Sequence, residues 1–112
     1  MSSPTPVLEP AGPASVFAAL GDAVRLELLA RLNDGRARSI SQLTTGLGLT
    51  RQGVTKHLGV LERAGIVSSR RVGRENRFVY RDEPIRDATS YLDAVSAQWD
   101  EALARLKAYL GE

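Results

Sequence analysis

Apolar residues recur at steps of three and four along much of the chain, which is the spacing of helices that bury one face. A short apolar run over residues 14–20 ends at Gly21 and predicts a first helix. A second helix follows over residues 23–33, where Asp22 can cap the first free backbone N–H groups. Its buried face would consist of Val24, Leu28 and Leu32.

Two further helices are joined by only three residues, the sequence GLT at 48–50. The third helix has two candidate caps: Ser41, or Ser39, which has a glutamine three residues later and so offers a capping box. Gly48 can adopt the positive φ angle of a sharp turn, and Thr50 can cap the fourth helix. Helices joined this closely predict a helix-turn-helix.

The fourth helix, within residues 50–66, combines an apolar stripe with a polar side. The buried stripe would consist of Val54, Leu58 and Leu61. The polar side near the start carries Thr50, Arg51, Gln52, Thr55 and Lys56. Gly53 and Gly59 each cost about 0.5 to 1 kcal/mol relative to alanine inside a helix. They indicate either a tolerated weakness or a surface that another molecule approaches closely, and the basic face fits the second interpretation.

Residues 67–81 change to a strand pattern on either side of the turn sequence GREN, which predicts a β-hairpin. The hairpin carries a dense set of cations against one acid, with Arg74 near the tip. These cations are Arg70, Arg71, Arg74, Arg77 and Arg81. They could be a solvated edge that discourages sheet aggregation, but their number beside a basic helix favours contact with DNA.

A long helix is predicted over about 84–110, with Pro84 at its first position. Its apolar stripe runs through Ile85, Ala88, Leu92, Val95, Trp99, Ala102, Leu106 and Tyr109. Such a helix spans about 39 Å, too long for so small a domain to cover, so part of the stripe needs a partner chain. Trp99, the only tryptophan, is interpreted as part of that interface.

The composition suits one small domain after a flexible tail. The chain has 112 residues, 43% of them hydrophobic. Residues 1–13 contain four prolines and predict the tail, which leaves 14–112 as the folded domain. The N-terminus lacks the features of a signal peptide and no stretch is long enough to span a membrane, so we expect a cytoplasmic protein.

The charge is unevenly distributed along the chain. Residues 36–81 hold ten Lys/Arg against Glu62 and Glu75, a net charge of +8, whereas the whole chain is only +2. The flanking segments are mildly acidic. This asymmetry predicts that a polyanion binds the middle of the chain.

The sequence holds few residues that could form a catalytic or metal-binding site. The chain has no cysteine and one histidine, His57, at the edge of the fourth helix's buried stripe. Its ring nitrogens would be satisfied by backbone or by a DNA phosphate. Asp87, Asp93 and Asp100 on the last helix cannot alone make a selective transition-metal site. The sequence GLGLT is a turn between helices rather than a phosphate loop. We expect neither an enzyme nor a cofactor.

Three segments closely resemble the ArsR family of bacterial winged-helix transcriptional regulators: FAALGDAVRLELLARL, SISQLTTGLGLTRQGVTKHLGVLERAGIV and SSRRVGRENRFVYR. The resemblance runs from about Ser15 to Leu110, and VTKHLGVLERAGIV is its most specific part. It implies a winged helix-turn-helix fold, mainly α, with five helices and a two-stranded wing. It also implies a homodimer that pairs through its first and last helices, with the fourth helix in the major groove and the wing along the backbone or minor groove.

The chain lacks the metal ligands found in the metal-sensing members of this family. Those members use cysteines on the helix before the recognition helix, or histidine and carboxylates on the last helix. The sequence is similar instead to a cysteine-free branch of the family, for which metal sensing is not expected.

The sequence therefore predicts a regulator specific for double-stranded DNA, a repressor acting as a homodimer on a pseudo-palindromic operator. The alternative is a basic winged-helix module that docks an acidic protein or RNA. The expected DNA contacts are Thr50, Arg51, Gln52, Thr55, Lys56 and His57 on the recognition helix, and Arg70, Arg71, Arg74 and Arg77 on the wing. The expected dimer contacts are Phe17, Leu92, Val95, Trp99, Leu103, Leu106 and Leu110.

Overall fold

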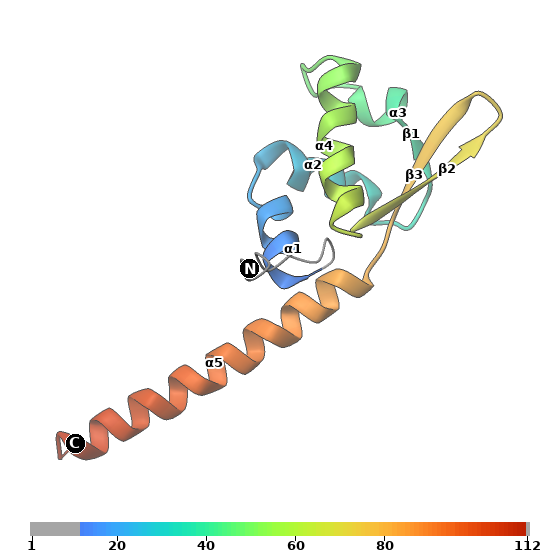
Figure 1. Cartoon of the computed structure of the whole chain (residues 1–112). Helices are drawn as coiled ribbons and strands as arrows, with labels where there is room; N and C mark the ends of the chain where they lie inside the picture. The colour runs from blue at the N-terminus through green and yellow to red at the C-terminus, as the bar shows by residue number, and fades with distance from the viewer. Residues whose placement is uncertain (1–11, 112) are drawn as a thin grey trace, which may run out of the picture.

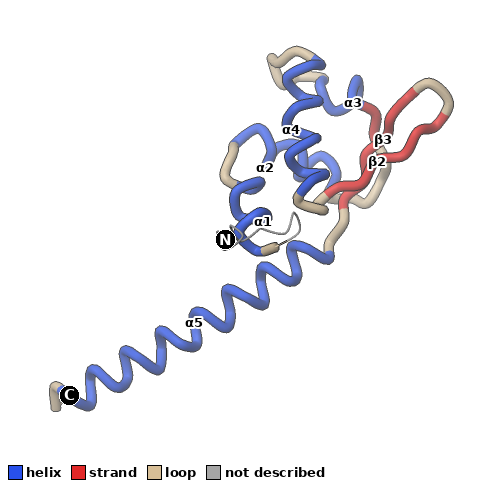
Figure 2. Tube along the Cα trace, in the orientation of Figure 1, coloured by secondary structure: helices blue, strands red, loops and turns tan. Residues whose placement is uncertain are grey.

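Five helices and a three-stranded antiparallel sheet form the described part of the chain, residues 12–111 of a computed structural model (Figures 1 and 2). The elements are α1 Pro13–Leu20, α2 Ala23–Leu32, β1 Arg38–Ser39, α3 Ile40–Thr44, α4 Arg51–Arg63, β2 Val67–Val72, β3 Glu75–Tyr80 and α5 Glu83–Tyr109. The predicted winged helix-turn-helix fold is confirmed. The predicted tail over 1–13 lies almost entirely outside the described residues, and Pro13 already belongs to α1.

The first two helices meet at a capped junction. Gly21 ends α1, and the Asp22 carboxylate accepts from the backbone N–H of Val24 at 2.8 Å and of Arg25 at 3.1 Å. These two bonds stabilise the charged carboxylate and so hold the pKa of Asp22 below its ordinary value, and the bond from the Arg25 N–H has the larger effect. The predicted cap is confirmed.

The start of the third helix is decided by Ser39. Its hydroxyl oxygen accepts from the Gln42 N–H at 3.2 Å, and its own N–H donates to Gln42 Oε1 at 2.9 Å. This capping box, rather than Ser41, begins α3. After it the chain turns through Gly48 at φ +69°, and the Thr50 hydroxyl accepts from the Gly53 N–H at 3.0 Å to cap α4.

One core joins the helices to the sheet. The predicted stripe residues Leu28, Leu32, Val54, Leu58 and Leu61 are all fully buried, together with Val16, Leu43, Ile66 and Val67. Phe78 of β3 closes the cluster from the sheet side at 5% exposure. The helical spacing of apolar residues therefore predicts correctly which face of α2 and of α4 is covered.

The wing is a hairpin with a two-residue turn. Val72 pairs with Glu75, so only Gly73 and Arg74 lie between the strands, and Gly73 takes φ +64°. A glycine in this conformation at the first turn position suits the twist of paired strands. A short third strand, β1, pairs with the other edge of β3, with Arg38 opposite Phe78. Two residues are too few to show an alternating pattern, so the sequence does not predict β1.

Helix α5 extends away from the body of the molecule (Figure 1). It begins at Glu83, which makes Pro84 its second residue rather than its first, and its 27 residues span about 40 Å. Its first half packs against α1, where the Phe17 and Tyr91 ring centroids lie 6.3 Å apart. Ala88 is the one buried residue of α5, so most of its apolar stripe is uncovered.

Candidate nucleic-acid interface

The exposed side of α4 carries the polar residues that the sequence indicates. Arg51, Gln52, Thr55 and Lys56 are exposed, on the side away from the buried stripe. The Thr55 hydroxyl donates to the Arg51 carbonyl oxygen at 2.7 Å, so it offers a partner its lone pairs and its methyl group. The Thr50 hydroxyl accepts from the Gly53 N–H, which leaves its own proton free to donate.

Gly53 lies next to the cap of α4. A Cβ added there would lie 3.3 Å from Thr50 Oγ1, a close contact that a shift of a few tenths of an ångström would relieve. A Cβ at Gly59 would lie 3.4 Å from Arg63 Nη1, the end of a flexible side chain. Neither contact by itself requires a glycine, so close approach by another molecule stays a hypothesis.

Helix α4 and the wing tip border one hollow. It has a volume of about 210 Å³ and brings Arg51 of α4 together with Arg74 of the turn. Its other lining residues are Ser39, Ile40, Ser41, Glu75 and Asn76. Two cations far apart in the sequence thus face the same space, between the start of the helix and the tip of the wing.

The wing arginines divide between two faces of the sheet. Side chains alternate along a strand, and Ser69 of β2 faces α4, because its hydroxyl donates to Glu62 Oε2 at 2.5 Å. Arg71 lies on the same inner face as Ser69. Arg70 lies on the outer face, directly opposite Arg77 of β3.

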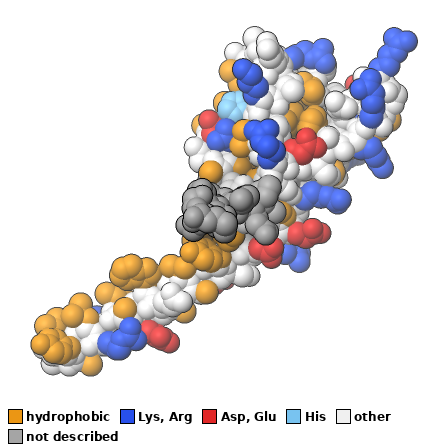
Figure 3. All heavy atoms as spheres, in the orientation of Figure 1, with side chains coloured by type: hydrophobic (Ala, Val, Ile, Leu, Met, Phe, Trp, Pro, Cys, Tyr) orange, Lys and Arg blue, Asp and Glu red, His pale blue; other side chains and the backbone are white. Residues whose placement is uncertain are grey.

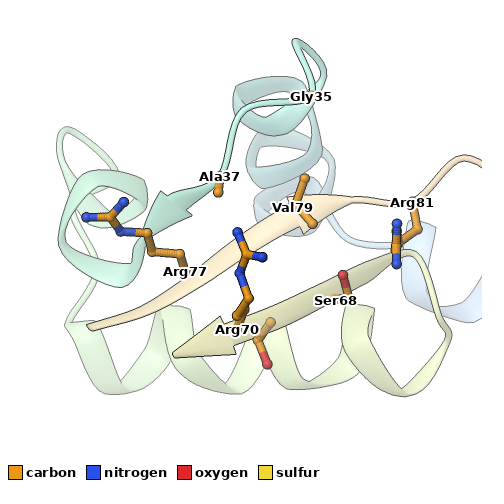
Figure 4. Close-up of a pocket in the computed structure, with 8 residues that line it drawn as sticks. Gly35, Ala37, Ser68, Arg70, Arg77, Val79 and Arg81 are labelled. Atoms are coloured by element: carbon orange, nitrogen blue, oxygen red, sulfur yellow. The ribbon is translucent and has the colours of Figure 1, made fainter. Parts of the chain in front are cut away.

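The outer face forms a second, larger hollow of about 530 Å³ (Figure 4). Arg70 and Ser68 from β2, and Arg77, Val79 and Arg81 from β3 and its end, lie along it. Arg77 also donates to the Glu75 carboxylate at 3.0 Å. The four wing arginines expected at the DNA therefore do not form a single surface.

His57 is placed differently from the other recognition-helix residues. Its side chain is 26% exposed and is turned toward the start of α2. Nδ1 lies 3.2 Å from Arg25 Nη1 and 3.8 Å from Asp22 Oδ1. The ring is half-buried, as its place at the edge of the buried stripe predicts. The partner of Nδ1 is the Arg25 side chain, and not the expected backbone group or phosphate.

Two arginines that support this surface were not singled out from the sequence. Arg31 Nη1 donates to the carbonyl oxygens of Leu43, at 3.1 Å, and of Thr45, and so ties α2 to the end of α3. Arg25 ties α2 to α1 and α4. Each lies three residues from Leu28 and so flanks the buried face of α2. That spacing indicates a partly covered guanidinium, but not its partners.

The expected dimer residues form an exposed apolar surface along α5 and α1. Trp99 is 65% exposed, Leu92 is 52% and Leu110 is 60%. Leu103 and Leu106 are each 51% exposed, and Phe17 and Val95 are half-buried. Apolar side chains run along the helix to its C-terminal end (Figure 3). An apolar surface of this extent is typical of a protein interface.

The described residues hold neither a cluster of metal ligands nor a membrane-spanning helix. Within 12–111, no group of three or more His, Asp or Glu side chains is arranged to hold a metal ion. None of the helices there has the length and apolar character needed to cross a membrane. The cations that line the two hollows make the surfaces around α4 and the wing the candidate site.

Comparison with known proteins gives consistent matches. Residues 20–70 match the model of a family described as a helix-turn-helix domain. YuzN of Bacillus subtilis, an HTH-type transcriptional regulator, is 35% identical over 79 residues, which cover 65% of this chain and 86% of that protein.

Two solved structures extend the match to the whole fold. An ArsR-like transcriptional regulator from Rhodococcus sp. RHA1 is 41% identical, with a TM-score of 0.75 over 85% of this chain and 89% of its own. A homodimeric winged helix-turn-helix DNA-binding domain from Mycobacterium bovis is 27% identical, with a TM-score of 0.58 over 82% of each chain.

Proposed function

Because the chain belongs to the ArsR family of winged helix-turn-helix transcriptional regulators, which bind DNA and are not enzymes, we propose that it is a homodimeric repressor of a pseudo-palindromic operator. The observation that carries the proposal is the hollow that Arg51 of α4 and Arg74 of the wing tip both line. It supports a single partner that contacts α4 and the wing together. A duplex has both features that such a surface needs: a major groove that admits α4 and phosphates beside it.

In the proposed complex, α4 lies in the major groove. Gln52 near its start can pair bidentately with adenine, and Arg51 and Lys56 can reach guanine or phosphates. Thr50 can donate its free hydroxyl proton to a phosphate, and Thr55 can accept from a base edge or contact a thymine methyl group. These roles follow from the donors and acceptors that the helix leaves unused.

The wing arginines take two roles in the proposal. Arg71, on the inner face, and Arg74, at the tip, contact phosphates or a narrow minor groove directly. Arg70 and Arg77, on the outer face, act on the duplex by general electrostatic attraction, which falls off over about 10 Å at 0.1 M salt.

The proposed dimer interface is formed by α5 together with α1. Its support is the exposed surface of Leu92, Trp99, Leu103, Leu106 and Leu110, where burial contributes about 25 cal/mol per Å² of apolar area. The Mycobacterium bovis relative, described as homodimeric, is consistent with it. A two-fold dimer would present two α4 helices to half-sites about one helical turn, or a multiple of it, apart. A dimer bound over a promoter would exclude the transcription machinery, which is the reason for proposing repression.

The test is footprinting of the protein on the region upstream of its own gene, followed by salt-titrated binding to the protected sequence and to a scrambled duplex. We expect protection of a pseudo-palindrome and a clear preference for it over the scrambled duplex at every salt concentration. Equal binding to both duplexes, governed only by salt, would contradict the proposal and favour a basic module for an acidic protein or RNA.

A further inference from the structure

The Arg25 side chain connects three helices through separate hydrogen bonds. Its Nε donates to the Ala19 carbonyl oxygen at 2.6 Å and its Nη2 to the Ala18 carbonyl oxygen at 3.2 Å. Both carbonyls lie in the last turn of α1, where backbone oxygens lack the usual partner four residues on, and the Ala18 oxygen also accepts from the Gly21 N–H at 3.3 Å. The third bond joins Nη1 to His57 Nδ1 of α4 at 3.2 Å. Arg25 therefore links α1, which packs on α5, to α4.

The chemistry of this third bond determines the state of the imidazole. A guanidinium has only donors and keeps its charge, so Nδ1 must be the acceptor and cannot carry a hydrogen. In a neutral ring the hydrogen then lies on Nε2, because the bond made by one nitrogen decides which nitrogen is protonated. The Asp22 carboxylate, 3.8 Å from Nδ1, is beyond hydrogen-bond distance.

We propose that Arg25 is a positioning residue for DNA recognition and that it acts through His57. It holds the imidazole in the tautomer whose Nε2–H is free to donate to a DNA phosphate, and it holds α4 in register with α1. This inference rests on the proposed placement of α4 against a duplex. It gives His57 a phosphate contact that depends on a residue of a different helix.

The competing view is that Arg25 only stabilises the end of α1. In that case its removal would lower stability without changing the imidazole or the role of Nε2. His57 is the one histidine of the chain, so every imidazole signal in a spectrum comes from this ring. Those signals therefore distinguish the two roles of Arg25.

The first measurement is nitrogen-15 NMR of His57 in the free protein at about pH 8. We expect Nδ1 to appear as an unprotonated acceptor and Nε2 as a protonated nitrogen, with this preference weakened in Arg25→Gln. Arg86→Gln is the matched control, since it removes the same charge from an exposed position at the start of α5. A wild-type ring protonated on Nδ1, or a tautomer unchanged by Arg25→Gln, would overturn the inference.

The second measurement is operator affinity. Arg25→Gln should weaken operator binding about tenfold more than Arg86→Gln, the size expected for one charge-assisted hydrogen bond. His57→Gln, which places an amide donor near the Nε2 position, should keep more affinity than His57→Asn, which places one near Nδ1. This comparison tests the inference even if Arg25→Gln does not fold.

A double-mutant cycle completes the test. If Arg25 acts through His57, combining Arg25→Gln with His57→Ala should weaken binding little beyond His57→Ala alone. Fully additive effects on affinity, or equal affinities of His57→Gln and His57→Asn, would overturn the inference while wild type still binds its operator. If the wild-type protein did not prefer the operator, the proposed function would be contradicted. The NMR measurement of the His57 tautomer does not depend on that outcome.

Discussion

Arg70 of β2 lies directly opposite Arg77 of β3, so two guanidinium groups share the outer face of the wing. Like charges in opposed strand positions repel each other and destabilise the pairing. The Glu75 carboxylate, 3.0 Å from Arg77 Nη2, offsets part of this repulsion. The hairpin therefore carries a small unfavourable term in the free protein, and a nearby polyanion would relieve it.

Replacing Arg70 should separate stability from binding. Arg70→Thr should raise the free energy of unfolding by roughly 0.2 to 1 kcal/mol, because it removes the repulsion and threonine suits a strand. Urea denaturation measures this. Arg71→Thr is the matched control, because Arg71 faces Asn76 and has no like charge opposite it. Arg71→Thr should weaken operator binding more than Arg70→Thr does, and the reverse order would contradict the division of the wing into two faces.

Substitutions in α4 and in the wing should affect DNA binding in different ways. Gln52→Ala should cost roughly 1 to 3 kcal/mol on the operator and little on a scrambled duplex, because it removes hydrogen bonds to a base. Arg74→Ala should weaken both duplexes by similar factors and reduce the salt slope by about one unit for each phosphate that the variant no longer neutralises. Salt-titrated binding of both variants gives the comparison. If Gln52→Ala affects both duplexes equally and Arg74→Ala removes only the preference, the two roles are reversed.

The apolar surface of α5 should be needed for dimerisation. Leu106→Glu should shift the protein from dimer to monomer in sedimentation equilibrium, because it places a charge in an interface otherwise formed by apolar side chains. Trp99, two helical turns away and the only tryptophan, should then show red-shifted fluorescence as water reaches its ring. Ala97→Glu, on the opposite side of α5, should leave both measurements unchanged. A Leu106→Glu protein that stays dimeric would place the interface elsewhere.

Lowering the pH should remove the stabilisation that the charged Asp34 carboxylate gives to the folded state. Arg38 donates to both Asp34 carboxylate oxygens, at 2.6 and 2.7 Å, and with the Arg36 N–H it holds the pKa of Asp34 well below its ordinary range. Because the folded pKa lies below the unfolded value of about 3.9, this stabilisation is present above about pH 4 and is lost as pH falls through the folded pKa. Unfolding midpoints of wild type and Asp34→Asn should thus differ most near pH 7 and converge on acidification. If the two midpoints differed by the same amount at every pH, the effect would come from hydrogen-bond geometry and not from the charge of Asp34.

The sequence by itself determined the helices, the caps of α2 and α4 and the turn of the wing, because these depend on residues within about four positions of one another; it left Ser39 and Ser41 open as the cap of α3. The spacing of Val54, Leu58 and Leu61 decided the buried face of α4, and Asp22, Thr50 and Gly73 determined where the chain starts a helix or turns. The concentration of cations between residues 36 and 81 was sufficient to indicate a polyanion as partner.

Only the tertiary structure decided which of these cations share a surface. Whether Arg70 or Arg71 faces α4 depends on the hairpin register, and a shift of one residue would exchange their faces. The bond from Arg25 to His57 spans 32 positions, and Arg31 reaches carbonyls 12 and 14 positions away. Strand β1 exists because β3 offers it a free edge. Such contacts depend on how helices and sheet pack around a common core, which no local pattern of residues specifies.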